Sequence, residues 1–168
     1  MRRLEAVDAV VAGRHEVGAT HTGFDLDTHL FFMLTQVMDR RDRQLTAYLR
    51  DYGLSVPKWR VLATLKARRK LSMLDLAGLT SLDPSTLSRT IDQMVEAGCV
   101  VRLADASDLR VVRVALTRAG VRRFAQVWPR VSDLNRAALV GIDAPDRQAL
   151  IGMLSSVRSN LGAHLTGR

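Results

Sequence analysis

The sequence has few of the residues on which many catalytic and metal-binding proteins depend. It contains one cysteine, Cys99, in 168 residues, so it has no internal disulfide and no Cys-x-x-Cys pair for zinc or redox chemistry. Its four histidines have no ligand-like spacing. Motifs for a serine nucleophile, a phosphate-binding loop, a zinc protease or a dinucleotide are missing. We therefore expect a protein that is not an enzyme and uses no metal or cofactor, with Cys99 as an inert structural thiol.

Long hydrophobic runs are also missing. No apolar stretch reaches the roughly 18 to 20 residues that a membrane-spanning helix needs. Near the start of the chain, Glu5 and Asp8 interrupt the apolar residues, which does not fit a secretory signal peptide. We expect a cytoplasmic protein with no membrane partner, in which residues 1–26 form an extension with a weak helix at about residues 4–11.

Acidic residues are scarce relative to basic ones. The chain has 25 Lys and Arg against 17 Asp and Glu, for a net charge of +8. Residues 56–70 contain six cations and no acid, and residues 99–123 contain six arginines against two acids. Such a balance favours a polyanionic partner, with nucleic acid first and an anionic membrane surface second. For residues 66–70, a solvated helix end that suits the helix dipole is the other interpretation.

Apolar periodicity predicts a mainly α protein with one small β-hairpin. The helices are expected at 27–52, from Pro57 onward, at 72–79 and 84–97, from about residue 118 onward, and at 145–165. The two strands are expected at 99–103 and 112–116. The predicted helix caps are Asp27, Ser72, Asp83, Thr117 and Asp143, and the predicted stops are Gly53 and Gly98.

The helix that follows Thr117 has its own predicted core face. Pro129 lies inside this helix and is expected to kink it. The side chains expected to point inward are Val121, Phe124, Val127, Trp128, Val131 and Leu134.

Helices 72–79 and 84–97 have the spacing of a helix-turn-helix. A helix enters the major groove of DNA when its outward face has small side chains and a few that read base edges. On the second helix, Ser85, Thr86 and Ser88 allow close approach and contact phosphates, Arg89 pairs with guanine, and Gln93 reaches adenine. The alternative is an ordinary amphipathic helix whose polar face is only solvated.

A basic hairpin directly after such a helix is typical of a wing. The hairpin tip ends in Arg110, and a narrow, A/T-rich minor groove attracts arginine through its enhanced negative potential. Asp108 is expected to hold the loop by bonding backbone amides or an arginine. A solvated loop cation and a simple turn residue are the alternatives for these two positions.

At this point the sequence resembles a known family. The string Asp108-Leu-Arg110-Val-Val-Arg-Val-Ala-Leu-Thr is similar to the D-x-R-x-x-x-V-x-L-T wing signature of MarR-type regulators. PSTLSRTIDQMVEAG (84–98) resembles the recognition helix of that family, particularly of its SlyA-like members, and YGLSVPKWRVLATL (52–65) resembles its second helix. The resemblance covers about residues 27–165, and Leu109 departs from it because many members have arginine there.

The resemblance implies a winged helix-turn-helix homodimer on a pseudo-palindromic DNA operator, usually as a repressor. Residues 27–168 then form one domain, with a DNA-binding lobe at about 55–117 and dimerisation helices at about 27–52 and 118–165. The residues themselves agree, because the end helices have more apolar surface than one small lobe buries. Two-fold symmetry would place the recognition helices about 34 Å apart. A monomer that folds these helices back on itself is the alternative.

The resemblance also implies a small, anionic, aromatic ligand in a cleft between the dimer helices and the lobe. A carboxylate on it would meet Arg60 or Arg123. Four of the six expected ligand residues have a second interpretation as ordinary core, and a DNA-binding or architectural protein without a ligand remains an alternative function. The expected ligand residues are His29, Met33, Trp59, Leu62, Phe124 and Trp128.

Overall fold

The computed structural model describes residues 25–105, 108 and 110–166. The chain divides into two compact units, Met1–Arg40 and Arg41–Arg168. The helix expected at residues 4–11 lies outside the described residues.

Helix α2 (Leu30–Arg50) begins in the first unit, three residues later than the sequence predicts. The reason is a local turn at Asp25, whose carboxylate accepts hydrogen bonds from the Asp27 N–H at 3.1 Å and the Thr28 hydroxyl at 2.9 Å. The imidazole Nδ1 of His29 then accepts the Phe32 N–H at 3.3 Å. The prediction that Asp27 caps this helix was therefore wrong, and His29 takes the capping place.

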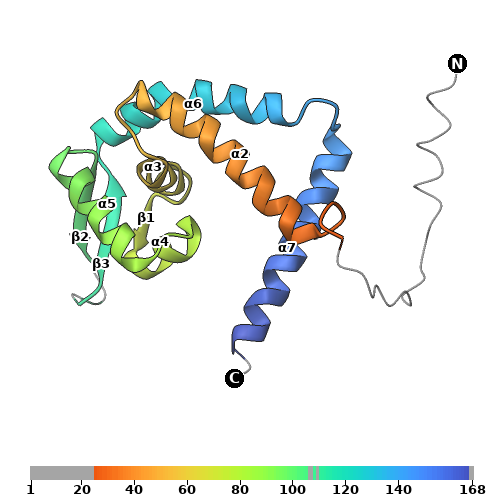
Figure 1. Ribbon diagram of the computed structural model, residues 1–168. Coiled ribbons are helices and arrows are strands. Elements are labelled where there is room, and N and C mark those ends of the chain that lie inside the picture. Colours follow the sequence, from red (N-terminus) through yellow and green to blue (C-terminus); the bar gives the residue numbers. More distant parts are fainter. Residues whose placement is uncertain (1–24, 106–107, 109, 167–168) are drawn as a thin grey trace, which may run out of the picture. The chain divides into compact units, whose positions relative to one another are not determined.

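The second unit has the predicted mainly α architecture with a wing (Figure 1). Two strands form the expected hairpin, and a short strand precedes the helix-turn-helix. After α2, the elements are α3 (Val56–Arg68), β1 (Lys70–Ser72), α4 (Met73–Thr80), α5 (Pro84–Glu96), β2 (Val100–Ala104), β3 (Val112–Leu116), α6 (Arg118–Ala138) and α7 (Ala144–Thr166).

Most of the predicted caps are confirmed. The Ser72 hydroxyl accepts the Asp75 N–H at 3.1 Å and the Thr117 hydroxyl accepts the Gly120 N–H at 3.1 Å. Asp143 caps α7 by accepting the Asp146 N–H at 2.9 Å. Each cap satisfies a helix N–H that has no partner inside the helix. After α5, Gly98 has φ +65°, the left-handed conformation that ends helices and that glycine adopts without strain.

The wing sheet has three antiparallel strands in the order β1-β3-β2. Strand β1, which the sequence did not predict, pairs Leu71 with Val114. On the other edge of β3, Arg102 of β2 pairs with the same Val114. The base of the wing is thereby attached to the segment that leads into the helix-turn-helix.

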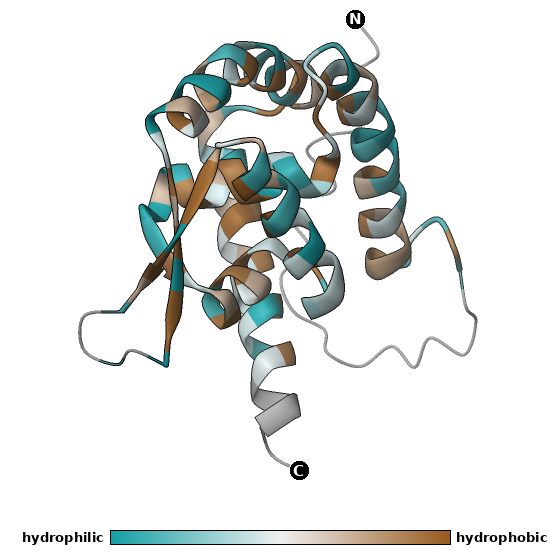
Figure 2. Ribbon diagram, turned by 90° about the vertical axis from the view of Figure 1, so that its left-hand side faces the viewer, coloured by the Kyte–Doolittle hydropathy of each residue, from teal (hydrophilic) through white to brown (hydrophobic). Residues whose placement is uncertain are grey.

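Two apolar cores support these elements. The apolar residues of the wing strands are visible in brown in Figure 2. The first core joins α3, α4 and α5 to the sheet, with Leu62, Leu76, Ile91 and Val114 among its buried side chains. The second core joins α2, α3 and α6 through Leu45, Leu49, Trp59, Val127, Val131 and Leu134.

Helix α6 has a narrower core face than the sequence predicts. Val127, Val131 and Leu134 are buried as expected, and Phe124 packs against both cores. Val121 and Trp128, however, are 40% and 45% exposed, so the prediction that they point inward was wrong for the isolated chain. The helix runs without interruption through Pro129.

Gly120 lets α6 approach the sheet closely. A Cβ atom at this position would lie 2.0 Å from the backbone oxygen of Cys99. The Thr117 hydroxyl donates to the Gly98 oxygen at 2.6 Å beside it. The first turn of α6 therefore lies directly against the junction between α5 and β2.

Candidate nucleic-acid interface

Helix α5 separates an apolar inner face from a polar outer face. Its inner face buries Leu87, Ile91 and Met94, together with Thr90, whose hydroxyl donates to the Thr86 oxygen at 2.7 Å. Of the predicted DNA-contacting residues on this helix, Thr86 is half-buried. The exposed ones are Ser85, Ser88, Arg89 and Gln93.

Asp83 fixes the first turn of α5. Its Oδ1 accepts the Thr86 N–H at 2.9 Å and the Ser85 hydroxyl at 2.6 Å. Hydrogen bonds from Ser85 first, and then from Thr86, hold the pKa of Asp83 well below its usual range. The cap is therefore a carboxylate at neutral pH, and Pro84 follows it in the first turn.

Arg89 lies along the outer face of α5, toward its N-terminus. Its Nε donates to the Ser85 carbonyl at 3.3 Å and its Nη2 contacts the Ser85 hydroxyl at 3.5 Å. The side chain is exposed, and no carboxylate of the described residues is paired with it. Its guanidinium thus keeps donors for a base edge or a phosphate.

Asp92 and Arg102 connect the outer face of α5 to the wing. The Arg102 Nη2 donates to Asp92 Oδ1 at 2.7 Å. This pair is not predicted from the sequence, because an acid on a helix and an arginine on the next strand give no local signal. The pair offsets the one acidic charge between Arg89 and Gln93 on this face.

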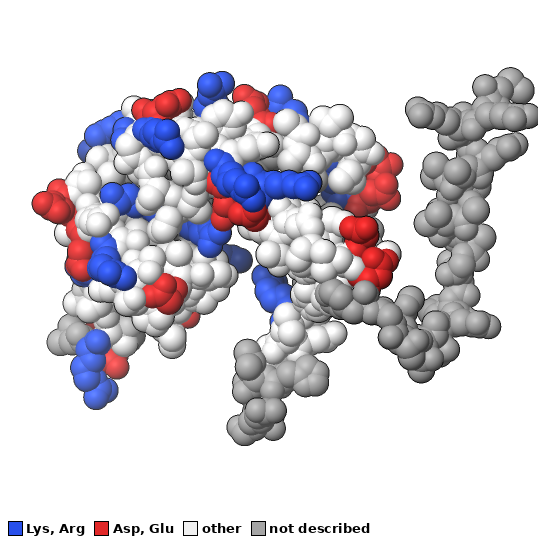
Figure 3. Space-filling view, in the orientation of Figure 1, with Lys and Arg blue, Asp and Glu red and all other residues white. Residues whose placement is uncertain are grey.

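The wing tip presents Arg110 to solvent. The Arg110 side chain is 91% exposed, and it reaches the Asp108 carboxylate through Nε at 3.2 Å. Asp108 also accepts the Arg110 backbone N–H at 3.0 Å, as predicted for a residue that shapes the loop. In Figure 3 a basic side chain stands at the lower end of the lobe, where the wing strands end.

A second acid braces the wing from within. Asp105, which is nearly buried, accepts a hydrogen bond from Arg113 Nε and another from the Asp108 N–H at 3.3 Å. One carboxylate therefore links β3 to the turn that presents Arg110. Asp105 was not among the predicted site residues, although its place between two strands and near two arginines was a usable signal.

The predicted ligand residues are only partly brought together. Trp59 stacks on Phe124 with ring centroids 5.3 Å apart, and Phe124 stacks on Trp128 at 5.7 Å. Leu62 is fully buried in the first core and Trp59 is buried in the second. The described chain thus leaves Trp128 as the open end of the stack, whereas His29 and Met33 lie in the other unit, Met1–Arg40.

Both predicted carboxylate partners already have partners of their own. Arg60 Nη2 pairs with Asp42 Oδ2 at 2.8 Å, and Arg123 Nη2 donates to the backbone oxygen of Tyr52. These arginines join α3 to α2 and α6 to the loop after α2. Each contact uses one guanidinium nitrogen, so the expected role of these arginines toward a ligand carboxylate stays a prediction. Cys99 is half-buried, with its Sγ 3.7 Å from the Ala97 oxygen.

Known proteins resemble this chain over most of its length. The model of the MarR family matches residues 54–112. A MarR-family transcriptional regulator from Silicibacter pomeroyi is 30% identical, covers 81% of this chain and 92% of its own, and superposes with a TM-score of 0.75. The HTH-type transcriptional repressor IacR of Pseudomonas putida is 27% identical over 131 residues, 78% of each chain.

A further structure contains DNA. It is a cysteine-to-serine variant of MarR from E. coli complexed with operator DNA, 27% identical, covering 76% of this chain and 92% of its own, with a TM-score of 0.66. No helix within the described residues is long and apolar enough to cross a membrane. The family match, the regulator that is 30% identical and the winged helix-turn-helix lead to one conclusion: the chain belongs to the MarR family of transcriptional regulators.

Proposed function

We propose that the protein is a sequence-specific, DNA-binding transcriptional repressor that acts as a homodimer on a pseudo-palindromic operator. The observation that carries the proposal is the outer face of α5, which is polar and exposed and is followed directly by a wing with Arg110 at its tip. The repressor IacR and the operator-bound MarR variant support the same assignment.

Each side chain of the interface has a proposed role. Ser85, Thr86 and Ser88 are short and permit close approach of the helix to phosphates and bases. Arg89 donates to the O6 and N7 atoms of a guanine, and Gln93 pairs with an adenine. Arg110 enters the minor groove beside the helix, and Asp108 sets its direction.

Dimerisation is supported by apolar surface that each end helix leaves exposed. In the first unit, Phe31, Met33 and Val37 of α2 are about half-exposed. Helix α7 has no buried side chain among its described residues, and Ile151 and Met153 are more than half-exposed. Exposed apolar surface of this extent is typical of a protein–protein interface.

A small aromatic ligand is proposed to release the operator. The exposed face of Trp128, at the end of the ring stack with Phe124 and Trp59, offers this ligand an aromatic surface. Offset stacking of a planar ring on Trp128 would add to burial of its apolar surface. A regulator without a ligand is the alternative, and no described contact favours it.

The test is fluorescence anisotropy of the purified protein on DNA from upstream of its own gene, titrated against scrambled competitor at several salt concentrations. We expect a preference of roughly a thousandfold or more, with two chains per site. Binding that depends on salt but not on sequence would show that the net charge of +8 alone attracts DNA. That result would favour the alternative function, an architectural DNA-binding protein, over a repressor.

A further inference from the structure

An apolar depression lies beside α4. It has a volume of about 580 Å³. Its walls come from the end of α3, from β1 and from α4. The residues that line it are Arg68, Leu71, Leu74, Asp75, Gly78 and Leu79, and we call it the α4 depression.

The floor and walls of the α4 depression are aliphatic. Leu74 is 83% exposed and Leu79 is 50% exposed, although both lie on a short helix whose Leu76 is fully buried. Gly78 lies between them and has no side chain, and a Cβ atom there would meet nothing within 4 Å. Exposed leucines around an open glycine are a surface from which an apolar molecule displaces water favourably.

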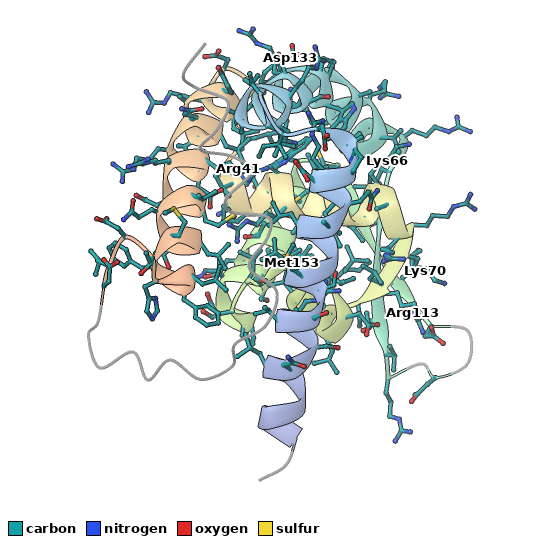
Figure 4. All side chains as sticks on the ribbon, turned by 90° about the vertical axis from the view of Figure 1, so that its right-hand side faces the viewer. Arg41, Lys66, Lys70, Arg113, Asp133 and Met153 are labelled. Atoms are coloured by element: carbon teal, nitrogen blue, oxygen red, sulfur yellow. The ribbon has the colours of Figure 1, made fainter. Side chains whose placement is uncertain are left out.

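The charged side chains that line the α4 depression are one cation, Arg68, and one acid, Asp75, and the cation Lys70 lies next to them on β1. Arg68 is exposed, and no carboxylate of the described residues pairs with it. The one acid of the depression, Asp75, accepts the Ser72 hydroxyl at 2.7 Å and so serves the cap of α4. Lys70 lies on the edge of the lobe that carries Arg113 in Figure 4. The complementary ligand is therefore an anion with an apolar body.

We propose that the α4 depression binds a small aliphatic carboxylate, such as a medium-chain fatty acid. Its carboxylate pairs with Arg68, and its chain lies on Leu71, Leu74 and Leu79 above Gly78. An aliphatic chain is favoured over an aromatic ring because leucines line the depression and no aromatic side chain of the described residues does. The ligand would contact both β1, which pairs with wing strand β3, and α4, the first helix of the helix-turn-helix.

The test is isothermal titration calorimetry of the full-length protein with octanoate, octanamide and benzoate. We expect octanoate to bind about tenfold or more tightly than octanamide, because only the carboxylate forms a charge-assisted bond with Arg68. We also expect octanoate to bind more tightly than benzoate. Failure of octanoate to bind saturably, or equal affinity for octanoate and octanamide, would overturn the proposal.

Two pairs of variants locate the site. Arg68→Gln should remove the preference for octanoate over octanamide, whereas Lys66→Gln, which neutralises a neighbour outside the depression, should keep it. Gly78→Leu should fill the depression and weaken both ligands about tenfold or more, whereas Ala67→Leu on the exposed end of α3 should not. Circular dichroism and the melting temperature report whether each variant folds. Unchanged binding in folded Arg68→Gln and Gly78→Leu would place octanoate elsewhere and refute the assignment.

Only the idea that the ligand regulates DNA binding rests on the proposed function. Octanoate binding itself is measured without DNA. Operator binding by the same preparations separates the two. If the wild-type protein binds its operator but not octanoate, the α4 depression is not a carboxylate site and the proposed function stands. If it binds octanoate but no specific DNA, the proposed function fails and the site remains.

Discussion

Arg102 on the first wing strand donates to Asp92 on the recognition helix across 2.7 Å, so that one ion pair joins the two elements proposed to contact DNA. Both side chains are more than one-third exposed, and pairs of this kind contribute roughly 0 to 1 kcal/mol to stability. The pair acts mainly on geometry and charge, because it joins β2 to α5 and offsets an acid on the face that we propose to approach phosphates.

Asp92→Asn is expected to increase the affinity for scrambled DNA, because it removes a negative charge from the outer face of α5 and frees Arg102. The free energy of unfolding should change by less than about 1 kcal/mol. Anisotropy titrations and urea denaturation measure the two effects. Asp133→Asn, which breaks the exposed ion pair with Arg136 on α6, is the matched control and should leave DNA affinity unchanged. Equal effects of the two variants would contradict the assigned role of Asp92.

Arg89→Ala is expected to cost about 1 to 3 kcal/mol on the best operator and to relax base preference at one position. The reason is loss of a two-bond contact with guanine. Anisotropy on a set of single-base operator variants measures the loss, and Arg118→Ala at the start of α6 removes an equal charge outside α5. A uniform loss on every sequence would instead make Arg89 a phosphate contact.

Arg110→Ala is expected to weaken binding most on operators with A/T-rich flanks, where the minor groove is narrow. Competition between operators that differ only in their flanks measures the difference. Asp108→Asn should give a smaller loss with the same flank dependence, because it loosens Arg110 without removing its charge. Equal losses on G/C-rich flanks would eliminate the minor-groove contact.

Asp105→Ala is expected to destabilise the protein by about 1 to 3 kcal/mol, because it leaves Arg113 and the Asp108 N–H without their acceptor. Arg113 is partly exposed, so the cost is below that of a fully buried pair. Urea denaturation measures the change. Arg113→Gln should cost less, since glutamine can still donate to Asp105, and a larger cost for Arg113→Gln would reverse this account of the brace.

The cap at Asp83 predicts a dependence on pH. Its pKa is lowered in the folded protein, so its stabilising effect is complete above the unfolded value of about 3.9 and declines as the pH falls below it. Wild type should therefore exceed Asp83→Asn in urea midpoint at about pH 6 by more than at about pH 3. Thr117→Ala removes a cap that does not titrate and should give a difference independent of pH. A constant difference for Asp83→Asn would show that its charge has no role.

The helix ends could be predicted from the sequence because capping is local. Ser72, Asp83, Thr117 and Asp143 each bond an N–H three residues ahead, so the signal lies within a few letters. The prediction that Asp27 caps α2 was wrong because Asp25 forms a turn before the helix and His29 caps it. Strand β1 was missed because its pairing with Val114 depends on residues far along the chain.

The periodicity of apolar residues predicted the outer face of α5, but it did not predict which side chains form ion pairs with it. The sequence located Arg89 and Arg110 by motif, and the structure shows both exposed. The pairing of Arg102 with Asp92, and of Arg60 with Asp42, depends on which elements meet in three dimensions. The core face predicted for α6 was also too wide. Periodicity shows which residues form an apolar stripe, but not which part of that stripe packs against another element.

The contact at Gly120 has a mechanical consequence. The backbone of α6 lies against the Cys99 oxygen, and the Thr117 hydroxyl donates to the Gly98 oxygen. The first turn of α6 is therefore held tightly against the end of α5. If α6 rotated, α5 and the wing strands would therefore move with it as one rigid body. In the proposed dimer, a change in the distance between the two recognition helices would then weaken operator binding while each lobe stays folded.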